Sequence, residues 1–352
     1  MVSDFLLYGS TGFVGDAIAR LAVKNGLQPM LAGRNSEKVG TLASELGLEY
    51  RVFNLEDNKA IDSALKDAAA VLHCAGPYIH TFKPMLDGCL RTGRHYLDIT
   101  GEIPVLETIA AHGPEAKARG VMLMPGVGFD VVPTDCLAAH LKQRLPSATQ
   151  LTLAFHSQGP AGLPPGTLKT SVEMIPYGTK ARRRNGRLES VPGRRKTQMI
   201  DFGQGPVEAN MLSWGDVITA FYSTGIPNIE VYAAFPKEMV LQMTIVDYLH
   251  PLFRLSAVRS FAKRGMKGGS TAEERARTRV SVWGEVQDDQ ERKAVSRLHG
   301  PEAGVVWTAN AALAVVQKVL ANDIKPGFQT PSSVYGPDFV LEGEGVTRED
   351  LP

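Results

Sequence analysis

The first 130 residues alternate between short apolar runs and segments whose apolar positions recur every three or four residues. This alternation is typical of βαβ units. The pattern predicts strands at 4–8, 28–32, 49–53, 70–74, 95–99 and 121–124, and helices at 13–24, 36–46, 58–66, 82–91 and 104–119. Strands fed by helices in this order predict an α/β fold with a Rossmann-type, doubly wound parallel sheet. Ser36 is the expected N-cap of the second helix.

The pattern changes after Pro125. A helix is expected at 134–145, alternating strands at 151–156 and 228–235, and a hairpin around Asp288 and Asp289. Long stretches between these elements are rich in proline, glycine or arginine. This mixture predicts an inserted α+β domain with a mixed sheet.

A nearly all-apolar helix is expected at 303–321, too hydrophobic for an exposed position, and we expect it to pack on the first domain. The chain therefore divides into three predicted parts. Residues 1–130 form a Rossmann domain, residues 131–300 an α+β domain for which substrate binding and dimerisation are expected, and residues 301–352 a segment that returns to the Rossmann domain.

The composition narrows the functional classes. The net charge of the 352 residues is +1, so the chain has no global positive field to collect nucleic-acid phosphates. Cys74, Cys89 and Cys136 are too few for a disulfide framework and indicate a reducing compartment, so a cytoplasmic location is expected. The N-terminus shows no secretory signal pattern, and no run of about 18 apolar residues predicts a spanning helix.

The first predicted strand ends in three glycines spaced three apart, and a predicted helix follows at once. A strand that ends this way is typical of a dinucleotide site, where the glycines allow a tight turn and close approach of a pyrophosphate to the helix N-terminus. The alternative is a set of turn and packing glycines of the kind found in any α/β protein. The residues expected to contact the dinucleotide here are Gly9, Ser10, Thr11, Gly12, Phe13 and Gly15.

The end of the second strand distinguishes between the two nicotinamide cofactors. Sites for NAD usually carry an acidic residue there, whereas this chain has Arg34 followed by Asn35. A guanidinium suits the 2′-phosphate, so NADP(H) is predicted, and a solvated arginine is the alternative.

The fourth strand ends in the small residues Ala75, Gly76 and Pro77, followed by Tyr78. Because ligands bind at the carboxyl ends of the strands in a doubly wound sheet, the nicotinamide is expected near this turn. The alternative is a simple turn without a ligand.

Six motifs occur along the chain in the order YGSTGFVG, LAGRN, HCAGPY, HYLDITGE, PGVGFDVVPTD and PGFQTPSSVYG. In this order they resemble the saccharopine dehydrogenase-like oxidoreductases, a family that includes the trans-acting enoyl reductases of actinobacterial lipid synthesis. The resemblance covers most of the chain and implies an NADP-type Rossmann domain, an inserted mixed-sheet domain and a reductase activity.

Three residues near the predicted strand ends are candidates for catalysis. Tyr78 could give a proton to a reduced product, and Asp98 or Asp130 could hold a charged substrate group. The carboxylates could instead tie down a loop or cap a helix. Asp135 is a further acid in this region, as is Glu102. The histidines of this half lack metal-ligand spacing, so no metal is predicted.

Two other stretches stand out. Residues 239–268 are strongly apolar, with basic residues at Arg254, Arg259, Lys263, Arg264 and Lys267, and they suit either contact with a membrane or lipid, or a core helix with a solvated basic end. The arginine clusters at 182–184 and 194–196 suit an acidic substrate or a solvated loop.

The leading hypothesis is an NADPH-dependent reductase of C=C or C=N bonds in a small or carrier-bound substrate, acting as a homodimer. The second hypothesis is a non-catalytic NADP-binding scaffold associated with membrane or lipid. The sequence leaves open which bond is reduced.

Overall fold

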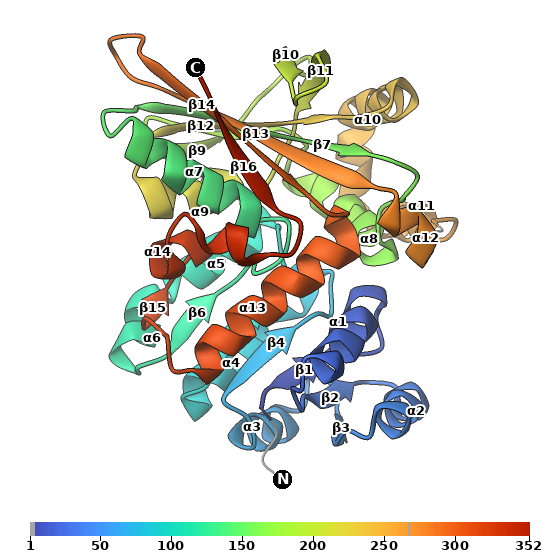
Figure 1. Cartoon of the computed structure of the whole chain (residues 1–352). Helices are drawn as coiled ribbons and strands as arrows, with labels where there is room; N and C mark the ends of the chain where they lie inside the picture. The colour runs from blue at the N-terminus through green and yellow to red at the C-terminus, as the bar shows by residue number, and fades with distance from the viewer. Residues whose placement is uncertain (1–3, 267) are drawn as a thin grey trace.

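The computed structural model describes residues 4–266 and 268–352. Figure 1 shows two sheets, one in the lower half of the view with helices on both faces and one across the top. Lys267, one of the basic residues noted in the apolar stretch, lies outside the described residues.

The first sheet has seven strands in the order β15-β6-β5-β4-β1-β2-β3, and its neighbouring strands pair in parallel. The doubly wound Rossmann-type sheet is therefore confirmed. Its strands are β1 (Leu6–Tyr8), β2 (Met30–Gly33), β3 (Tyr50–Val52), β4 (Ala70–His73), β5 (His95–Asp98), β6 (Met122–Met124) and β15 (Gly327–Phe328).

The helices of this half follow the predicted spacing with two differences. The helix expected at 104–119 is split at His112, because Gly113 and Pro114 begin a new helix there. The N-cap of α2 is Asn35, whose side chain accepts a hydrogen bond from the Lys38 amide at 2.9 Å, and not Ser36. The helices are α1 (Phe13–Lys24), α2 (Ser36–Leu46), α3 (Asn58–Lys66), η1 (Tyr78–His80), α4 (Phe82–Thr92), α5 (Ile103–Ala111) and α6 (Gly113–Ala118).

The second sheet runs β10-β11-β12-β7-β13-β14-β16, with the hairpin β8–β9 attached beside β12. It is mixed, because β12 and β7 pair in parallel while the other pairs are antiparallel. Its strands are β7 (Gln150–Gln158), β8 (Ala181–Arg184), β9 (Arg187–Ser190), β10 (Thr197–Asp201), β11 (Pro206–Met211), β12 (Asn228–Ala234), β13 (Arg279–Gln287), β14 (Lys293–Gly300) and β16 (Thr347–Leu351).

Helices α7 and α9 lie between the two sheets, whereas α8 and α10–α12 lie at the right-hand side of Figure 1. One apolar cluster runs from Leu7 and Leu72 of the first sheet through Leu141 of α7 to Val282 of the second. The two halves therefore share a continuous core. The helices are α7 (Val132–Arg144), α8 (Pro165–Met174), η2 (Ile175–Tyr177), α9 (Asp216–Thr224), α10 (Lys237–Leu249), η3 (His250–Arg254), α11 (Ser256–Lys263) and α12 (Ala272–Ala276).

The C-terminal segment contributes to both halves. A π-helical turn, η4 (Ala303–Trp307), leads into α13 (Thr308–Leu320), which packs against α1 and β4 as expected. After β15 come α14 (Pro331–Tyr335) and η5 (Phe339–Glu342). The chain then crosses back, and β16 pairs with β14. The predicted return to the Rossmann domain is thus wrong for the last strand, because the open edge of β14 supplies the hydrogen-bonding partners for 347–351.

One helical stretch among the described residues, Ala303–Leu320, is long and apolar enough to cross a membrane. Of this stretch, 56% is buried inside the structure. Its packing against α1 and β4 accounts for its apolar character, so it is a core helix of this fold.

Candidate active site

The turn between β1 and α1 requires glycine at two of its three glycine positions. Gly9 has a φ of +85°, and a Cβ there would lie 2.8 Å from the Ala75 nitrogen. A Cβ on Gly15 would lie 2.2 Å from the Gly9 carbonyl oxygen, so only glycine lets α1 start this close to the strand. Gly12 is exposed at the N-terminus of α1, where unpaired amides can meet a ligand. These positions form a cradle that any side chain would fill.

The neighbouring side chains take different roles. Ser10 is fully buried and donates its hydroxyl to the Ala32 carbonyl at 3.2 Å, so it holds the turn to the end of β2. Thr11 is half-buried beside it. Phe13 is 39% exposed, and the Arg275 guanidinium lies 5.8 Å from its ring centroid. A segment of the second half of the chain therefore lies over the start of α1.

Arg34 directly follows β2 and is exposed. In the part of the chain that the structure describes, no acidic side chain forms an ion pair with it. Its guanidinium is free to meet an anionic ligand. Asn35 is committed to capping α2, so its side-chain oxygen is not available to a cofactor while that cap is formed.

The turn after β4 lies directly beside the glycine turn, as the approach of Gly9 to Ala75 shows. The Gly76–Pro77 peptide bond is cis. A Cβ on Gly76 would lie 3.4 Å from the hydroxyl of Thr170 on α8. The second half of the chain thus reaches the strand ends at this point.

The Tyr78 hydroxyl is occupied by a hydrogen bond at the end of β4. It donates to the His73 carbonyl at 3.3 Å, the Tyr78 ring lies edge-on to His73, and burial raises the pKa of Tyr78 well above the ordinary value. The carboxylate of Glu102 accepts the amides of Tyr78 and Ile79, both at 2.7 Å. Burial raises the pKa of Glu102 to about 7. These contacts fix the turn and leave the Tyr78 hydroxyl without an open face.

Asp98 is fully buried at the end of β5 and accepts three hydrogen bonds. The Tyr96 hydroxyl donates at 2.7 Å, and the amides of Thr100 and Gly126 donate at 2.9 Å each. Burial raises the pKa of Asp98 to about 6. Asp98 therefore joins the loops after β5 and β6, which is the structural alternative considered for it.

Asp130 differs from the other acids at this edge. Its carboxylate is half-buried and makes no hydrogen bond to the described residues, while its backbone carbonyl accepts the Trp214 indole N–H at 3.0 Å. Burial raises the pKa of Asp130 to about 7. A Cβ on Gly101 would lie 3.1 Å from this carboxylate, so only a small residue fits beside it. In contrast to Asp98 and Glu102, Asp130 has a carboxyl group with no hydrogen-bond partner among the described residues.

An aromatic cluster joins the two halves beside Asp130. The ring centroids of Phe129 and Phe155 are 5.9 Å apart, those of Phe129 and Trp307 are 5.4 Å apart, and those of Phe155 and Trp214 are 4.9 Å apart. Phe129 is 5% exposed and belongs to the shared core. The partly exposed members, Phe155 and Trp214, provide an apolar wall near the strand ends.

Residues 5–124 match the family described as the saccharopine dehydrogenase NADP binding domain. This match spans the chain from β1 to β6 and leaves the second sheet outside it. The matched residues contain the glycine turn, Arg34 and the turn after β4, so the predicted cofactor class is confirmed.

Curated relatives extend the likeness to oxidoreductases. The chain is 27% identical over 194 residues to a human saccharopine dehydrogenase-like oxidoreductase, covering 47% of this chain and 44% of the relative. It is 33% identical over 150 residues to a trans-acting enoyl reductase of Mycobacterium leprae, covering 40% of this chain and 36% of the relative. The matches therefore span less than half the length of these relatives.

A solved structure agrees over the whole chain. The apo saccharopine dehydrogenase (L-Glu forming) from Saccharomyces cerevisiae superposes with a TM-score of 0.67 at 14% identity, covering 99% of this chain and 100% of that one. At this identity the match shows the fold alone. It includes the mixed second sheet, so the resemblance in architecture is not limited to the NADP-binding domain.

The residues of the NADP-binding domain fit the cofactor for which the family is named. The glycine cradle and the free amides at the start of α1 suit a pyrophosphate, and the unpaired Arg34 suits a 2′-phosphate. Across residues 4–266 and 268–352, no group of three or more His, Cys, Asp and Glu is placed to hold a metal ion.

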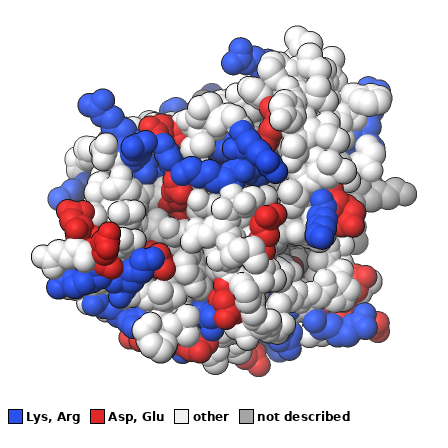
Figure 2. Space-filling model, turned by 90° about the horizontal axis from the view of Figure 1, so that it is seen from above, with Lys and Arg blue, Asp and Glu red and all other residues white. Residues whose placement is uncertain are grey.

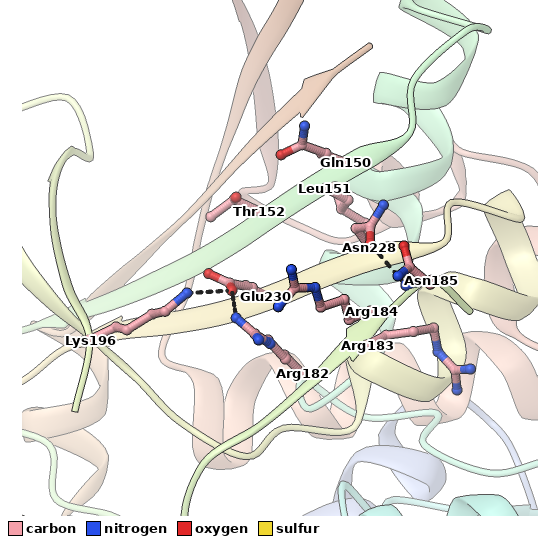
Figure 3. A pocket seen from close by; sticks show the side chains of 10 residues that line it. All are labelled: Gln150, Leu151, Thr152, Arg182, Arg183, Arg184, Asn185, Lys196, Asn228 and Glu230. Atoms are coloured by element: carbon pink, nitrogen blue, oxygen red, sulfur yellow. Dashed lines mark hydrogen bonds and ion pairs between the residues drawn. The ribbon is translucent and has the colours of Figure 1, made fainter. Parts of the chain in front are cut away.

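The arginine cluster at 182–184 lies outside this domain. It forms β8, and not a solvated loop, and lines an open pocket of about 480 Å³ beside β7 and β12 (Figure 3). Glu230 accepts Arg182 at 3.2 Å and Lys196 at 2.9 Å. Arg183 turns away and stacks on Phe221 at 4.1 Å. Much of the local positive charge is thus neutralised within the protein.

Proposed function

We propose that the protein is an NADPH-dependent reductase that adds hydrogen across a C=C or C=N bond of a small or carrier-bound substrate. The observation that supports this most strongly is the pairing of a glycine cradle and a free Arg34 with one unpartnered acid, Asp130, at the same sheet edge. The cradle and the arginine suit the cofactor, and the acid suits the proton that any such reduction requires.

The cofactor-binding roles follow from position. The Gly12 amide already donates to the Gly9 carbonyl at 3.0 Å, so the amides of the first turn of α1 would bind the pyrophosphate, and Arg34 would bind the 2′-phosphate. Bound NADPH supplies the hydride. The Gly76–Pro77 turn, which has little side-chain bulk, would leave room for the nicotinamide ring beside α8.

We assign proton delivery to Asp130 in preference to Tyr78 or Asp98. A reduction places a hydride on one atom of the double bond and a proton on the other. Asp130 would give its proton to the second atom and regain it from water. Its pKa of about 7 leaves a large protonated fraction at neutral pH, whereas the Tyr78 hydroxyl is already bound to His73.

The choice of bond rests on the relatives. The enoyl reductase of M. leprae favours a C=C substrate, and the saccharopine dehydrogenase-like relatives favour a C=N substrate. The apolar wall of Phe155 and Trp214 would exclude water from either one. A cytoplasmic location and a homodimeric state belong to the same proposal.

The test is NADPH oxidation by the wild type against a panel of enoyl thioesters and cyclic imines. Turnover on one class is expected, and Asp130→Asn is expected to reduce kcat by about 10²–10⁴-fold, as for loss of a general acid. Asp323→Asn, which changes an acid far from the strand ends, is the matched control. NADPH binding without turnover on any substrate would support the non-catalytic scaffold instead.

A further inference from the structure

Three successive helical elements, α10, η3 and α11, contain no buried residue. This stretch, residues 237–263, follows β12 and forms the outer right-hand part of the molecule in Figure 1. Large apolar side chains are exposed along it. They are Leu241 (63%), Ile245 (50%), Tyr248 (78%), Leu249 (44%), Leu252 (52%), Leu255 (60%) and Phe261 (77%).

Helix α10 has its apolar side chains on the outside. Leu241, Ile245 and Tyr248 are spaced four and three residues apart and therefore form one exposed stripe. The inner face is held by a charge cluster, because Asp247 accepts Arg195 at 2.6 Å and lies 3.7 Å from Lys180. The side chains of these three charged residues are 10% exposed or less. The usual arrangement of a surface helix is inverted here.

Helix α11 shows the same inversion. Arg259 and Lys263, one turn apart, both pair with Glu173 of α8, whose side chain is 6% exposed. Phe261 lies between them in sequence and is exposed. Both helices are thus anchored by ions on the inside, and the outside carries the apolar stripe of α10 and Phe261 of α11. An apolar surface of this extent marks a contact with something other than water.

The charges around the exposed apolar side chains of 237–263 indicate which kind of partner this surface contacts. Lys237, Arg254 and Arg264 are exposed and pair with no acid in the parts of the chain that the structure describes. The exposed acid within the stretch is Glu238, since Asp247 is occupied internally. In Figure 2, the upper right-hand part of the face seen from above is largely white, with blue groups near its margin.

This pattern complements an anionic lipid surface better than a second copy of the chain. Apolar side chains in the acyl boundary with cations at the headgroup level are typical of interfacial helices. A two-fold contact through the same patch would bring its cations close to one another, with few acids to compensate them.

We propose that α10, η3 and α11 form a membrane-docking surface that inserts its exposed apolar side chains into the headgroup region of an anionic lipid bilayer. Arg254 and Arg264 contact lipid phosphates. The helices remain outside the hydrocarbon centre and are anchored to the protein through Asp247 and Glu173. Because α11 packs on α8, the docked surface lies next to the helix that reaches the Gly76 turn.

Flotation of the full chain with vesicles tests this surface. Binding is expected to vesicles of phosphatidylcholine with about one third phosphatidylglycerol, and at least tenfold weaker to phosphatidylcholine alone. The double variant Tyr248→Ser/Phe261→Ser is expected to bind at least tenfold more weakly than wild type. The control is Tyr50→Ser/Met199→Ser, which removes two exposed apolar side chains elsewhere, at 46% and 61% exposure.

Charge reversal tests the cations separately. Arg254→Glu/Arg264→Glu should lose the preference for anionic vesicles, while Lys24→Glu/Lys59→Glu on α1 and α3 should keep it. Hydrogen exchange of the wild type should slow in 237–263 when anionic vesicles are added. Three results would overturn the proposal: no flotation with either vesicle, flotation unchanged by both patch variants, or a wild-type dimer that Tyr248→Ser/Phe261→Ser converts to monomer without lipid binding.

Discussion

At the residue scale, the environment of each acid decides what it can do. Asp98 ends β5 and Asp130 lies in the loop after β6, yet Asp98 accepts three hydrogen bonds and the Asp130 carboxylate accepts none from the described side chains and amides. Both have a raised pKa because burial disfavours the charged form. The sequence places both acids at the correct sheet edge, but their partners come from loops far apart in the chain, which local pattern does not predict.

The glycine cradle gives a steric prediction. Gly15→Ala should destabilise the protein by about 1–3 kcal/mol and abolish cofactor binding, because the new Cβ would overlap the Gly9 carbonyl. Gly40→Ala within α2 is the matched control, since its Cβ would meet Tyr50 at an ordinary 3.6 Å. Urea unfolding and NADPH titration measure both. An unaltered NADPH affinity in Gly15→Ala would contradict the assigned cradle.

Arg34 gives a prediction on cofactor preference. Arg34→Ala should reduce the preference for NADPH over NADH by about 10- to 100-fold, because a charge-assisted hydrogen bond contributes roughly 1.5–3 kcal/mol. Affinity for NADH should change little. Titration of both cofactors measures the ratio, with Arg51→Ala on β3 as the control. If Arg34→Ala and wild type have the same ratio of NADPH to NADH affinity, Arg34 does not bind the 2′-phosphate.

The raised pKa of Asp130 predicts a dependence of stability on pH. Its folded-state pKa of about 7 lies above the unfolded value of about 3.9, so the folded protein binds more protons between these values. The stabilisation that protonated Asp130 gives the folded state is therefore complete below about pH 4. The free energy of unfolding falls as this stabilisation is lost between about pH 4 and pH 7.

Asp130→Asn removes that contribution. The free energy of unfolding of the variant minus that of wild type should therefore increase by more than about 1 kcal/mol between pH 4 and pH 8. Asp98 and Glu102 act in the same direction in both proteins, so the difference between the two pH profiles isolates Asp130. Denaturant unfolding at several pH values provides the data, and parallel profiles would show that Asp130 titrates normally.

At the element scale, periodicity predicted most helices and strands of the first sheet, because these elements are short, amphipathic or fully buried and end at glycines. It failed where a local interruption or a distant partner decides the structure. Pro114 splits one helix, and the arginines of 182–184 form a strand because β12 and β9 lie alongside. The apolar residues of 237–263 were visible in the sequence, but their outward orientation depends on ion pairs with Lys180 and Arg195, which lie between strands, and with Glu173 of α8.

The anchoring of α10 can be tested through its buried acid. Asp247→Asn leaves Arg195 and Lys180 without a counter-charge, which costs about 3–5 kcal/mol for a buried pair. The loss should appear as faster hydrogen exchange in 237–249 with little change in α1. Asp87→Asn breaks the exposed pair with Lys83 and serves as the control. Uniform change across the chain would show that α10 is not held separately.

At the scale of the whole molecule, the two sheets share one hydrophobic core. Leu137 and Leu141 of α7 pack under Gly284 of β13, where a Cβ would lie 2.6 Å from Leu141, and the same apolar cluster continues into the first sheet. The pattern of apolar and polar positions predicted a Rossmann sheet before Pro125 and a mixed sheet after it. It did not predict the pairing of β16 with β14, because five terminal residues carry no periodicity that specifies a partner.

The central claim is that this fold binds NADPH through the glycine cradle and Arg34. Isothermal titration of the wild-type protein with NADPH and with NADH tests it most directly. The account predicts saturable binding of one NADPH per chain and at least tenfold weaker binding of NADH. Absence of binding heat with both cofactors, from folded protein at several temperatures, would contradict it.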